Sequence, residues 1–197
     1  NTNTNTNTVL VTFQEASVPK DRHLVWTVTP VIPPHLVPPQ MMWSSIGIVT
    51  PPSIDTVLLH LRRLIDMTSH SGHFDHWPFP ESTTAVFQSI YQFLDENWDR
   101  VSPNIKAALR EEPCVPIGMS LVKASRLYFR MSQPLAPFMF EVPRAFGSQD
   151  RLLKALGAKQ TPTIQDYSEL LTDLHDECGP EPLNPNEVVA VLKVVGL

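Results

Sequence analysis

Proline is the residue that most constrains what this chain can fold into. The 197 residues include 20 prolines but only 7 glycines, so proline is about twice as frequent as the ~5% of an average protein. Each proline fixes φ and lacks the N–H group that a helix interior or a central strand requires. It also drives the residue before it into an extended conformation. We therefore expect short helices and strands joined by stiff extended stretches.

Two proline-spaced runs are expected to be extended, one before residue 40 and one between Pro134 and Pro143. The first run interleaves its prolines with apolar side chains: Val31, Ile32, Leu36 and Val37. This interleaving favours packing against the protein itself. The Pro-x-x-Pro spacing of Pro30 and Pro33 leaves a second interpretation open, in which the run is the ligand of an aromatic groove and the chain is a free-standing adaptor.

Outside the proline runs, the sequence predicts an α+β fold in which short helix pairs alternate with small β-hairpins. Helical spacing and cap residues predict these helices: Ser53–Asp66, Ser82–Trp98, a short one from Ser102, Gln149–Leu156, Thr163–Glu177 and one from Asn184 onward. Short β-type runs predict these strands: Val9–Phe13, Leu24–Val28, Cys114–Ile117, Leu121–Lys123 and Leu127–Phe129. Gly157 is expected to end its helix in the left-handed conformation.

An internal match at an offset of 110 residues predicts a tandem-module architecture. The offset places these residues over one another: Ile46-Gly47 over Leu156-Gly157, Pro52-Ser53-Ile54 over Pro162-Thr163-Ile164, and Leu61 and Leu64 over Leu171 and Leu174. We expect a first module over residues 9–143 and the start of a truncated second one over 144–197. The Asn-Thr repeat of residues 1–8 is expected to be a disordered lead-in. Modules that stack on neighbours commonly provide spacers and binding surfaces.

Composition excludes several classes of function. The net charge is −5 and the 15 basic residues are scattered, which predicts no nucleic-acid partner. No apolar stretch approaches the ~20 residues of a membrane span. The two cysteines, Cys114 and Cys178, make no disulfide framework and indicate reduced thiols in an intracellular protein. Protein partners, or neighbouring repeats of the same chain, are therefore expected, while the oligomeric state is left open.

The only residues that suggest a metal site are His70, His73 and His76, which lie close together in a predicted loop. No second ligand cluster accompanies them, so we expect a solvated loop, with a metal-binding domain as the alternative. Gly118-Met119-Ser120 falls short of a nucleophile elbow, and the sequence holds no phosphate-binding loop. The sequence therefore predicts no catalytic residue, no resident cofactor and no enzyme.

The stretch Pro33-Pro34-His35-Leu36-Val37-Pro38-Pro39-Gln40-Met41-Met42-Trp43, with Gly47 to Ile54 after it, resembles plant proteins of the NO VEIN type in the sacsin-like group. So do Trp77-Pro78, Asn97-Trp98, Leu121 to Pro143 and Leu183 to Glu187. The resemblance implies a fragment of a very large nuclear protein of vascular development and cell-fate determination. Such a parent carries a GHKL-type ATPase domain that uses ATP and Mg²⁺. None of its motifs lies here, so we expect a non-catalytic scaffold or interaction segment.

Overall fold

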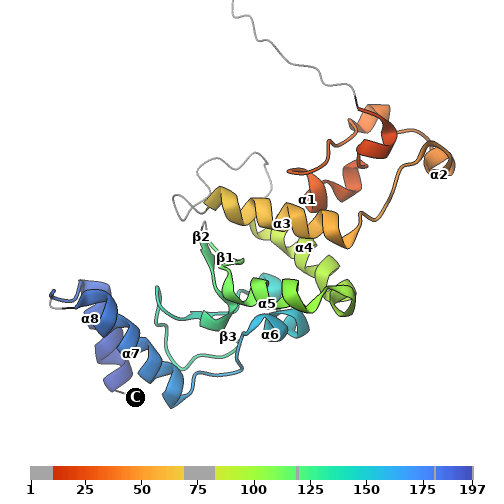
Figure 1. Ribbon diagram of the computed structural model, residues 1–197. Coiled ribbons are helices and arrows are strands. Elements are labelled where there is room, and N and C mark those ends of the chain that lie inside the picture. The colour runs from red at the N-terminus through yellow and green to blue at the C-terminus, as the bar shows by residue number, and fades with distance from the viewer. Residues whose placement is uncertain (1–10, 69–82, 119, 180, 197) are drawn as a thin grey trace, which may run out of the picture.

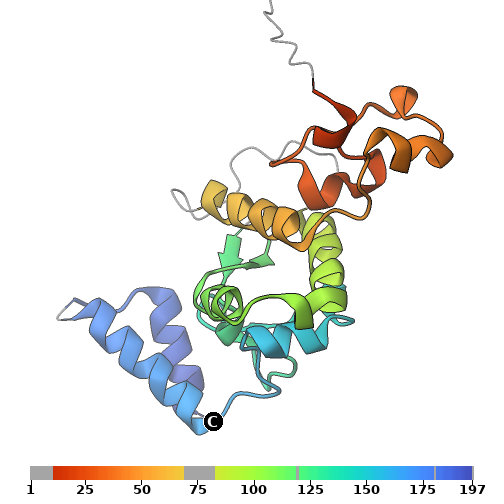
Figure 2. The ribbon, with the colours of Figure 1, turned by 45° about the vertical axis from the view of Figure 1, so that its right-hand side comes forward.

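The computed structural model describes residues 11–68, 83–118, 120–179 and 181–196. The molecule is elongated, and Figures 1 and 2 show the first helices at one end and the last two at the other. The first end contains α1 (Arg22–Val25) and α2 (Trp43–Ile46), and the other contains α7 (Ile164–Cys178) and α8 (Pro185–Val195). Between them lie α3 (Ile54–Thr68), α4 (Thr83–Asn97), α5 (Pro103–Glu111) and α6 (Asp150–Leu156).

Two small sheets complete the α+β fold, whose predicted class is confirmed. Strands β1 (Val115–Ile117) and β2 (Ser120–Val122) form the expected antiparallel hairpin. Strands β3 (Leu127–Tyr128) and β4 (Phe140–Glu141) pair in parallel, so the expectation of a second hairpin is wrong. A parallel pair requires a crossover connection, and residues 129–139 provide it.

The predicted helix starts are confirmed by their caps. Each cap side chain accepts a backbone N–H from the first turn, which satisfies a donor that lacks a partner within the helix. The bonds are Thr56 N–H to Ser53 Oγ (3.1 Å), Ile105 N–H to Ser102 Oγ (3.4 Å), Asp166 N–H to Thr163 Oγ1 (3.3 Å) and Glu187 N–H to Asn184 Oδ1 (3.1 Å). Local chemistry thus fixes where four of these helices begin.

One strand prediction is wrong, and the two proline runs are extended only in part. Leu24–Val28 is not a strand, because α1 covers its first residues and a turn follows. The Trp26 N–H bonds to the Arg22 carbonyl at 3.1 Å, so the backbone is satisfied locally rather than by a neighbouring strand. The proline run before residue 40 contains a 3-10 turn at Pro34–Leu36. The later run bends at Leu135, whose carbonyl accepts the Phe138 N–H at 3.0 Å.

The buried apolar residues form three clusters along the length of the molecule. A small N-terminal cluster contains Ala16, Val18, Ile32 and Ile48 with Trp43 and Ile46 packed against them. The large central cluster joins α3, α4 and α5 to the hairpin and α6. A C-terminal cluster joins α7 and α8 to Tyr128, Leu135 and Met139.

Two stretches of backbone, residues 12–68 and 123–178, share a similar order of local structures, although only the first contains the turn Pro19–Asp21 and helix α1. We call them the first and second segments. Each begins with a 3-10 turn, at Phe13–Glu15 and Ala124–Arg126. Each then forms a parallel bridge, between Ser17 and Val31 and between Tyr128 and Glu141. Each next makes a 3-10 turn that follows a proline, at Pro34–Leu36 and Arg144–Phe146. The offset is 111 residues before the bridge and 110 after it, because the intervening loop is one residue shorter in the second segment.

The correspondence continues through the helices. Residues 40–46 and 150–156 are helical, and each run ends at a left-handed glycine, Gly47 (φ +82°) or Gly157 (φ +118°). The residue after each glycine donates to the carbonyl five residues earlier at 2.9 Å, as in a Schellman cap. A side chain at Gly47 would meet Gln14, and one at Gly157 would meet Ser125, which holds the corresponding place. The 15-residue helices α3 and α7 then begin and end at corresponding positions.

Candidate interaction interface

The described residues do not show the metal site that the sequence left open as an alternative. His70, His73 and His76 lie outside the described residues, so the metal alternative stays a prediction. Elsewhere in the described part of the chain, no group of three or more His, Cys, Asp or Glu side chains could hold a metal ion. Likewise, no helix among these residues is long and apolar enough to cross a membrane. Cys114 is a buried free thiol, and burial raises its pKa to about 12, which makes it unreactive.

The proline-x-x-proline run is docked on its own protein. The Ser17 N–H donates to the Pro30 carbonyl and the Ile32 N–H to the Ser17 carbonyl, both at 2.9 Å. Ile32 is 6% exposed and belongs to the N-terminal cluster. A ligand run offers its whole face to an aromatic groove, so this packing counts against the adaptor interpretation.

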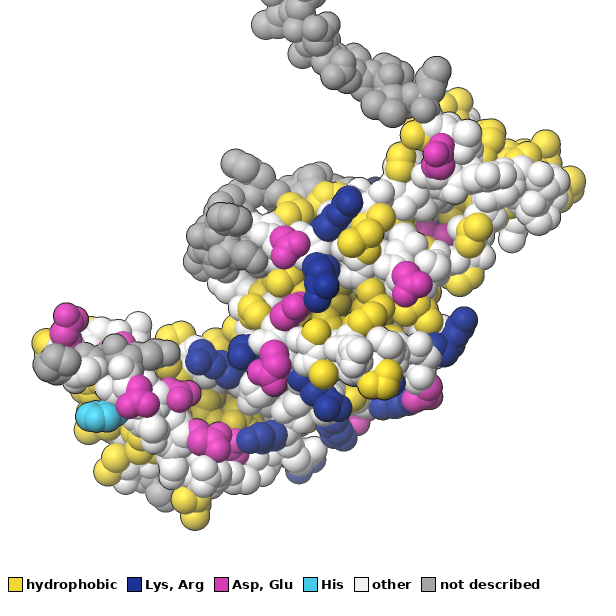
Figure 3. Space-filling view, viewed as in Figure 1, with side chains coloured by type: hydrophobic (Ala, Val, Ile, Leu, Met, Phe, Trp, Pro, Cys, Tyr) yellow, Lys and Arg dark blue, Asp and Glu magenta, His cyan; other side chains and the backbone are white. Residues whose placement is uncertain are grey.

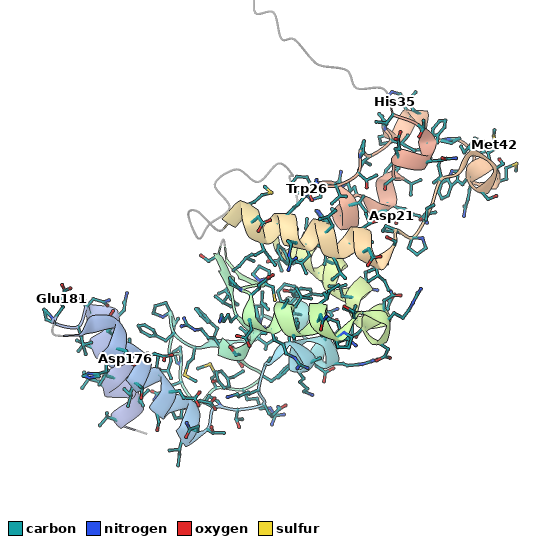
Figure 4. All side chains as sticks on the ribbon, in the orientation of Figure 1. Asp21, Trp26, His35, Met42, Asp176 and Glu181 are labelled. Carbon is teal, nitrogen blue, oxygen red and sulfur yellow. The ribbon has the colours of Figure 1, made fainter. Side chains whose placement is uncertain are left out.

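His60 is the most deeply buried histidine among the described residues, at 0% exposure on α3. Its Nε2–H donates to the His23 carbonyl at 3.0 Å, so Nδ1 is the acceptor for the Thr27 hydroxyl at 2.6 Å. Trp26 packs edge-on against the ring, with centroids 5.6 Å apart; Figure 4 labels Trp26 beside α3. Burial lowers the His60 pKa to about 4. The ring is therefore a neutral element of packing.

Tyr128, Lys159 and Asp166 come together beside α7 and line an open hollow. Burial alone raises the pKa of Asp166, but hydrogen bonds from Lys159 and Thr163 outweigh it and lower the pKa to about 2. The Asp166 carboxylate accepts the Thr163 N–H and hydroxyl, both at 2.7 Å. This is a capping box with aspartate in the place of the usual glutamate. The ionised carboxylate is thus used in starting a helix.

The contact between α4 and the second segment joins two parts of the chain that are distant in sequence. Phe146, at the end of the 3-10 turn Arg144–Phe146, is 0% exposed. Its ring lies 5.2 Å from that of Tyr91 on α4, tilted by 56°, a favourable arrangement for aromatic pairs. Tyr91 in turn donates its hydroxyl to the Cys114 carbonyl, and burial raises its pKa well above the usual range.

Helix α6 extends this contact. Leu152 and Leu153 are 0% exposed and Leu156 is 3% exposed within the central cluster. Polar bonds lie at the rim, where Arg151 Nη2 is 2.8 Å from both carboxylate oxygens of Asp99 and Arg110 Nε donates to the Ala155 carbonyl at 2.7 Å. An apolar centre with a polar rim is the usual anatomy of a protein interface.

The first segment carries the same apolar positions without a cover. Its N-terminal cluster uses Ala16, Ile32, Trp43, Ile46 and Ile48, which correspond to Leu127, Val142, Leu153, Leu156 and Ala158 of the central cluster. In the second segment α4 and α5 pack over these positions. Leu36 and Met42, the counterparts of Phe146 and Leu152, are 59% and 45% exposed. On this face the two segments differ in the presence of a helix pair, since α4 and α5 contact α6 of the second segment.

Sequence reasoning did not identify Tyr91 or Phe146 as interface residues. The signal that could have found them is the 110-residue offset extended toward the N-terminus. At that offset Ile32 falls on Val142, Pro33 on Pro143 and Leu36 on Phe146. The sequence match shows that Leu36 and Phe146 hold corresponding apolar positions. Only the fold shows that Phe146 is buried and Leu36 is exposed.

The chain is similar to human Sacsin, with 23% identity over an alignment of 192 residues that covers 87% of the chain. This supports a sacsin-like relationship. The chain spans only about 4% of the length of that relative. No protein-family model matches the chain, and no solved structure matches it either.

Proposed function

We propose that this chain is a non-catalytic scaffold and interaction segment of a large sacsin-like protein. In this proposal the two segments are copies of one structural unit, and α4 with α5 forms the surface on which the next copy docks. The observation that carries the proposal is the burial of Phe146 against Tyr91, at a position whose counterpart Leu36 lies exposed. Units that stack on their neighbours build extended surfaces, and such surfaces serve as spacers and binding platforms.

The polar chemistry of the described residues supports the same reading. His60 holds α1 against α3, and Asp166 caps α7. We propose that no residue of this chain is catalytic and that it holds no cofactor of its own. Its proposed partners are protein segments or neighbouring units, with no nucleic acid among them. If the purified chain hydrolyses ATP in the presence of Mg²⁺ faster than a heat-denatured sample, the non-catalytic proposal fails.

The resemblance to plant NO VEIN-type proteins leads to a finer proposal about the parent protein. We propose a nuclear plant protein of vascular development and cell-fate determination, in which this segment positions partners for an ATPase domain elsewhere in the polypeptide. The test is the distribution of the fluorescently tagged full-length protein in plant cells. Nuclear signal is expected, and exclusion from nuclei would rule this part out.

The interface itself is tested by a pair of matched substitutions. Phe146→Ala removes a fully buried ring from between α4 and α6, so we expect a loss of about 3–5 kcal/mol in the free energy of unfolding. Leu36→Ala removes the exposed counterpart, and its effect is expected to stay within about 0.5 kcal/mol. Urea unfolding followed by circular dichroism measures both values. Similar small losses in the two variants would show that the contact does not hold the segments together.

A further inference from the structure

We propose that the exposed apolar face formed by Leu36, Met42 and Trp43 binds helix α8 of a second copy of this chain, in a head-to-tail contact. The contact would repeat between molecules the one that α4 makes with the second segment within each molecule. The inference rests on the proposed function, because it takes the two segments as copies of one unit.

The first face is apolar and uncovered. Leu36 is 59% exposed, Met42 is 45% exposed and Trp43 is partly buried, whereas their counterparts Phe146, Leu152 and Leu153 are all 0% exposed. No Asp, Glu, Lys or Arg occurs between Pro30 and Ile54. Figure 3 shows hydrophobic side chains gathered at this end of the molecule. Lys20 places its ammonium 5.4 Å from the centroid of the Trp43 ring, so one cation borders the face, while Leu36 and Met42 are apolar and exposed. Exposed apolar surface of this kind calls for an apolar partner.

Helix α8 carries the complementary face. Val188, Leu192 and Val195 follow one another at helical spacing and are 40%, 67% and 73% exposed. Val191 and Val194 of the same helix pack against the C-terminal cluster, and Ala190 is 3% exposed. All three exposed residues are β-branched or leucine, so this stripe is as apolar as the face of the first segment.

The place of α8 in the fold indicates what its exposed stripe binds. Helix α8 follows α7 and packs against it, as α4 follows α3 and packs against it. Helix α4 buries a wider arc than α8 does: Val86, Phe87, Ile90, Tyr91, Phe93 and Leu94 are all buried. Part of that arc contacts α3 and part contacts Phe146 and α6. Helix α8 holds the same place after α7, and its stripe of Val188, Leu192 and Val195 is exposed instead of buried.

The two faces lie at opposite ends of the molecule. Figure 4 places Met42 at the end formed by α2, and Asp176 and Glu181 at the end formed by α7 and α8. One molecule therefore cannot cover its own face with its own α8. A contact between two different surfaces is heterologous, and it leaves a free face at each end of the pair. Self-association by this contact is expected to continue beyond the dimer.

The test uses two substitutions on opposite faces and measures mass by sedimentation equilibrium. For the unaltered chain, the average mass is expected to rise with concentration above the 22.2 kDa of one chain without levelling off at a dimer. Leu36→Glu and Leu192→Glu each place a charge on an exposed residue of one face, so each variant alone is expected to stay monomeric. An equimolar mixture still contains one intact face of each kind. We expect that mixture to form a 1:1 complex of twice the chain mass and no larger species.

Val49→Glu is the matched control. Val49 is 64% exposed, and its counterpart Lys159 is exposed in the second segment, outside the contact with α4 and α5. This variant is expected to associate like the unaltered chain, and circular dichroism checks that all variants fold. A monomeric unaltered chain, a closed symmetric dimer, or a mixture that fails to associate would overturn the inference. The Phe146→Ala result is independent of these outcomes, so the proposed function can stand if the head-to-tail contact fails.

Discussion

At the scale of single residues, His60 shows how a polar group is used for packing. Both ring nitrogens have partners, the Thr27 hydroxyl and the His23 carbonyl, and the ring is fully buried. Protonation of His60 would place a proton on Nδ1, which already accepts a hydrogen bond from the Thr27 hydroxyl. The resulting charge would also lie in a site that water does not reach. The low pKa of about 4 follows mainly from that burial.

This low pKa makes stability depend on pH. A histidine whose folded-state pKa is depressed from 6.5 to about 4 stays neutral in the folded protein, while the unfolded chain takes up a proton as the pH falls. Stability is therefore fully present above pH 6.5 and is lost progressively as the pH falls toward 4, by about 3 kcal/mol in all. The pKa of His23 is lowered as well, mainly by burial, and acts in the same direction.

Urea midpoints at pH 7 and pH 4.5 measure this loss. In His60→Gln the titrating ring is replaced by an amide, and we expect more than half of the pH dependence to disappear. His35 is exposed, so His35→Gln is expected to keep the dependence of the unaltered chain. An unchanged dependence in His60→Gln would show that other groups cause it.

At the scale of elements, sequence chemistry predicted helix starts better than strands. Ser53, Ser102, Thr163 and Asn184 all cap helices as expected, because a cap is a local bond between residues two or three positions apart. Leu24–Val28 was predicted wrongly as a strand, because a five-residue apolar run is ambiguous in its periodicity. The helical conformation of this run depends on a contact that is distant in sequence, in which the His23 carbonyl accepts a hydrogen bond from His60.

The contribution of the Thr163 cap can be compared with that of a hydroxyl inside the same helix, α7. Thr163→Ala removes the hydroxyl that accepts the Asp166 N–H and donates to the Asp166 carboxylate, so we expect a loss of about 1 kcal/mol in the free energy of unfolding. The Ser168 hydroxyl donates to the Ile164 carbonyl within the same helix. Ser168→Ala is accordingly expected to change stability by less than about 0.5 kcal/mol. Hydrogen exchange in the first turn of α7 reports the effect locally, and equal protection in both variants would contradict the role of the cap.

At the scale of the whole molecule, the sequence indicates a correspondence between two stretches but cannot show how they pack. The 110-residue offset relates Gly47 to Gly157 and Ser53 to Thr163, and the backbone follows it from the bridge residue Val31 to residue 68. Which apolar face receives α4 depends on contacts between residues as distant as Tyr91 and Phe146. The module boundary predicted between residues 143 and 144 remains a prediction, and the central cluster includes residues on both sides of it.

The most direct test of the central claim is whether the two segments unfold together. All four tryptophans precede residue 99, so fluorescence reports the first part of the chain, while circular dichroism reports the helices of both segments. In urea we expect the two signals to change in one coincident transition, and Phe146→Ala to lower both midpoints. Two separate transitions in the unaltered chain, with Phe146→Ala shifting only the dichroism signal, would show that the segments are independent and that the docking surface we propose does not couple them.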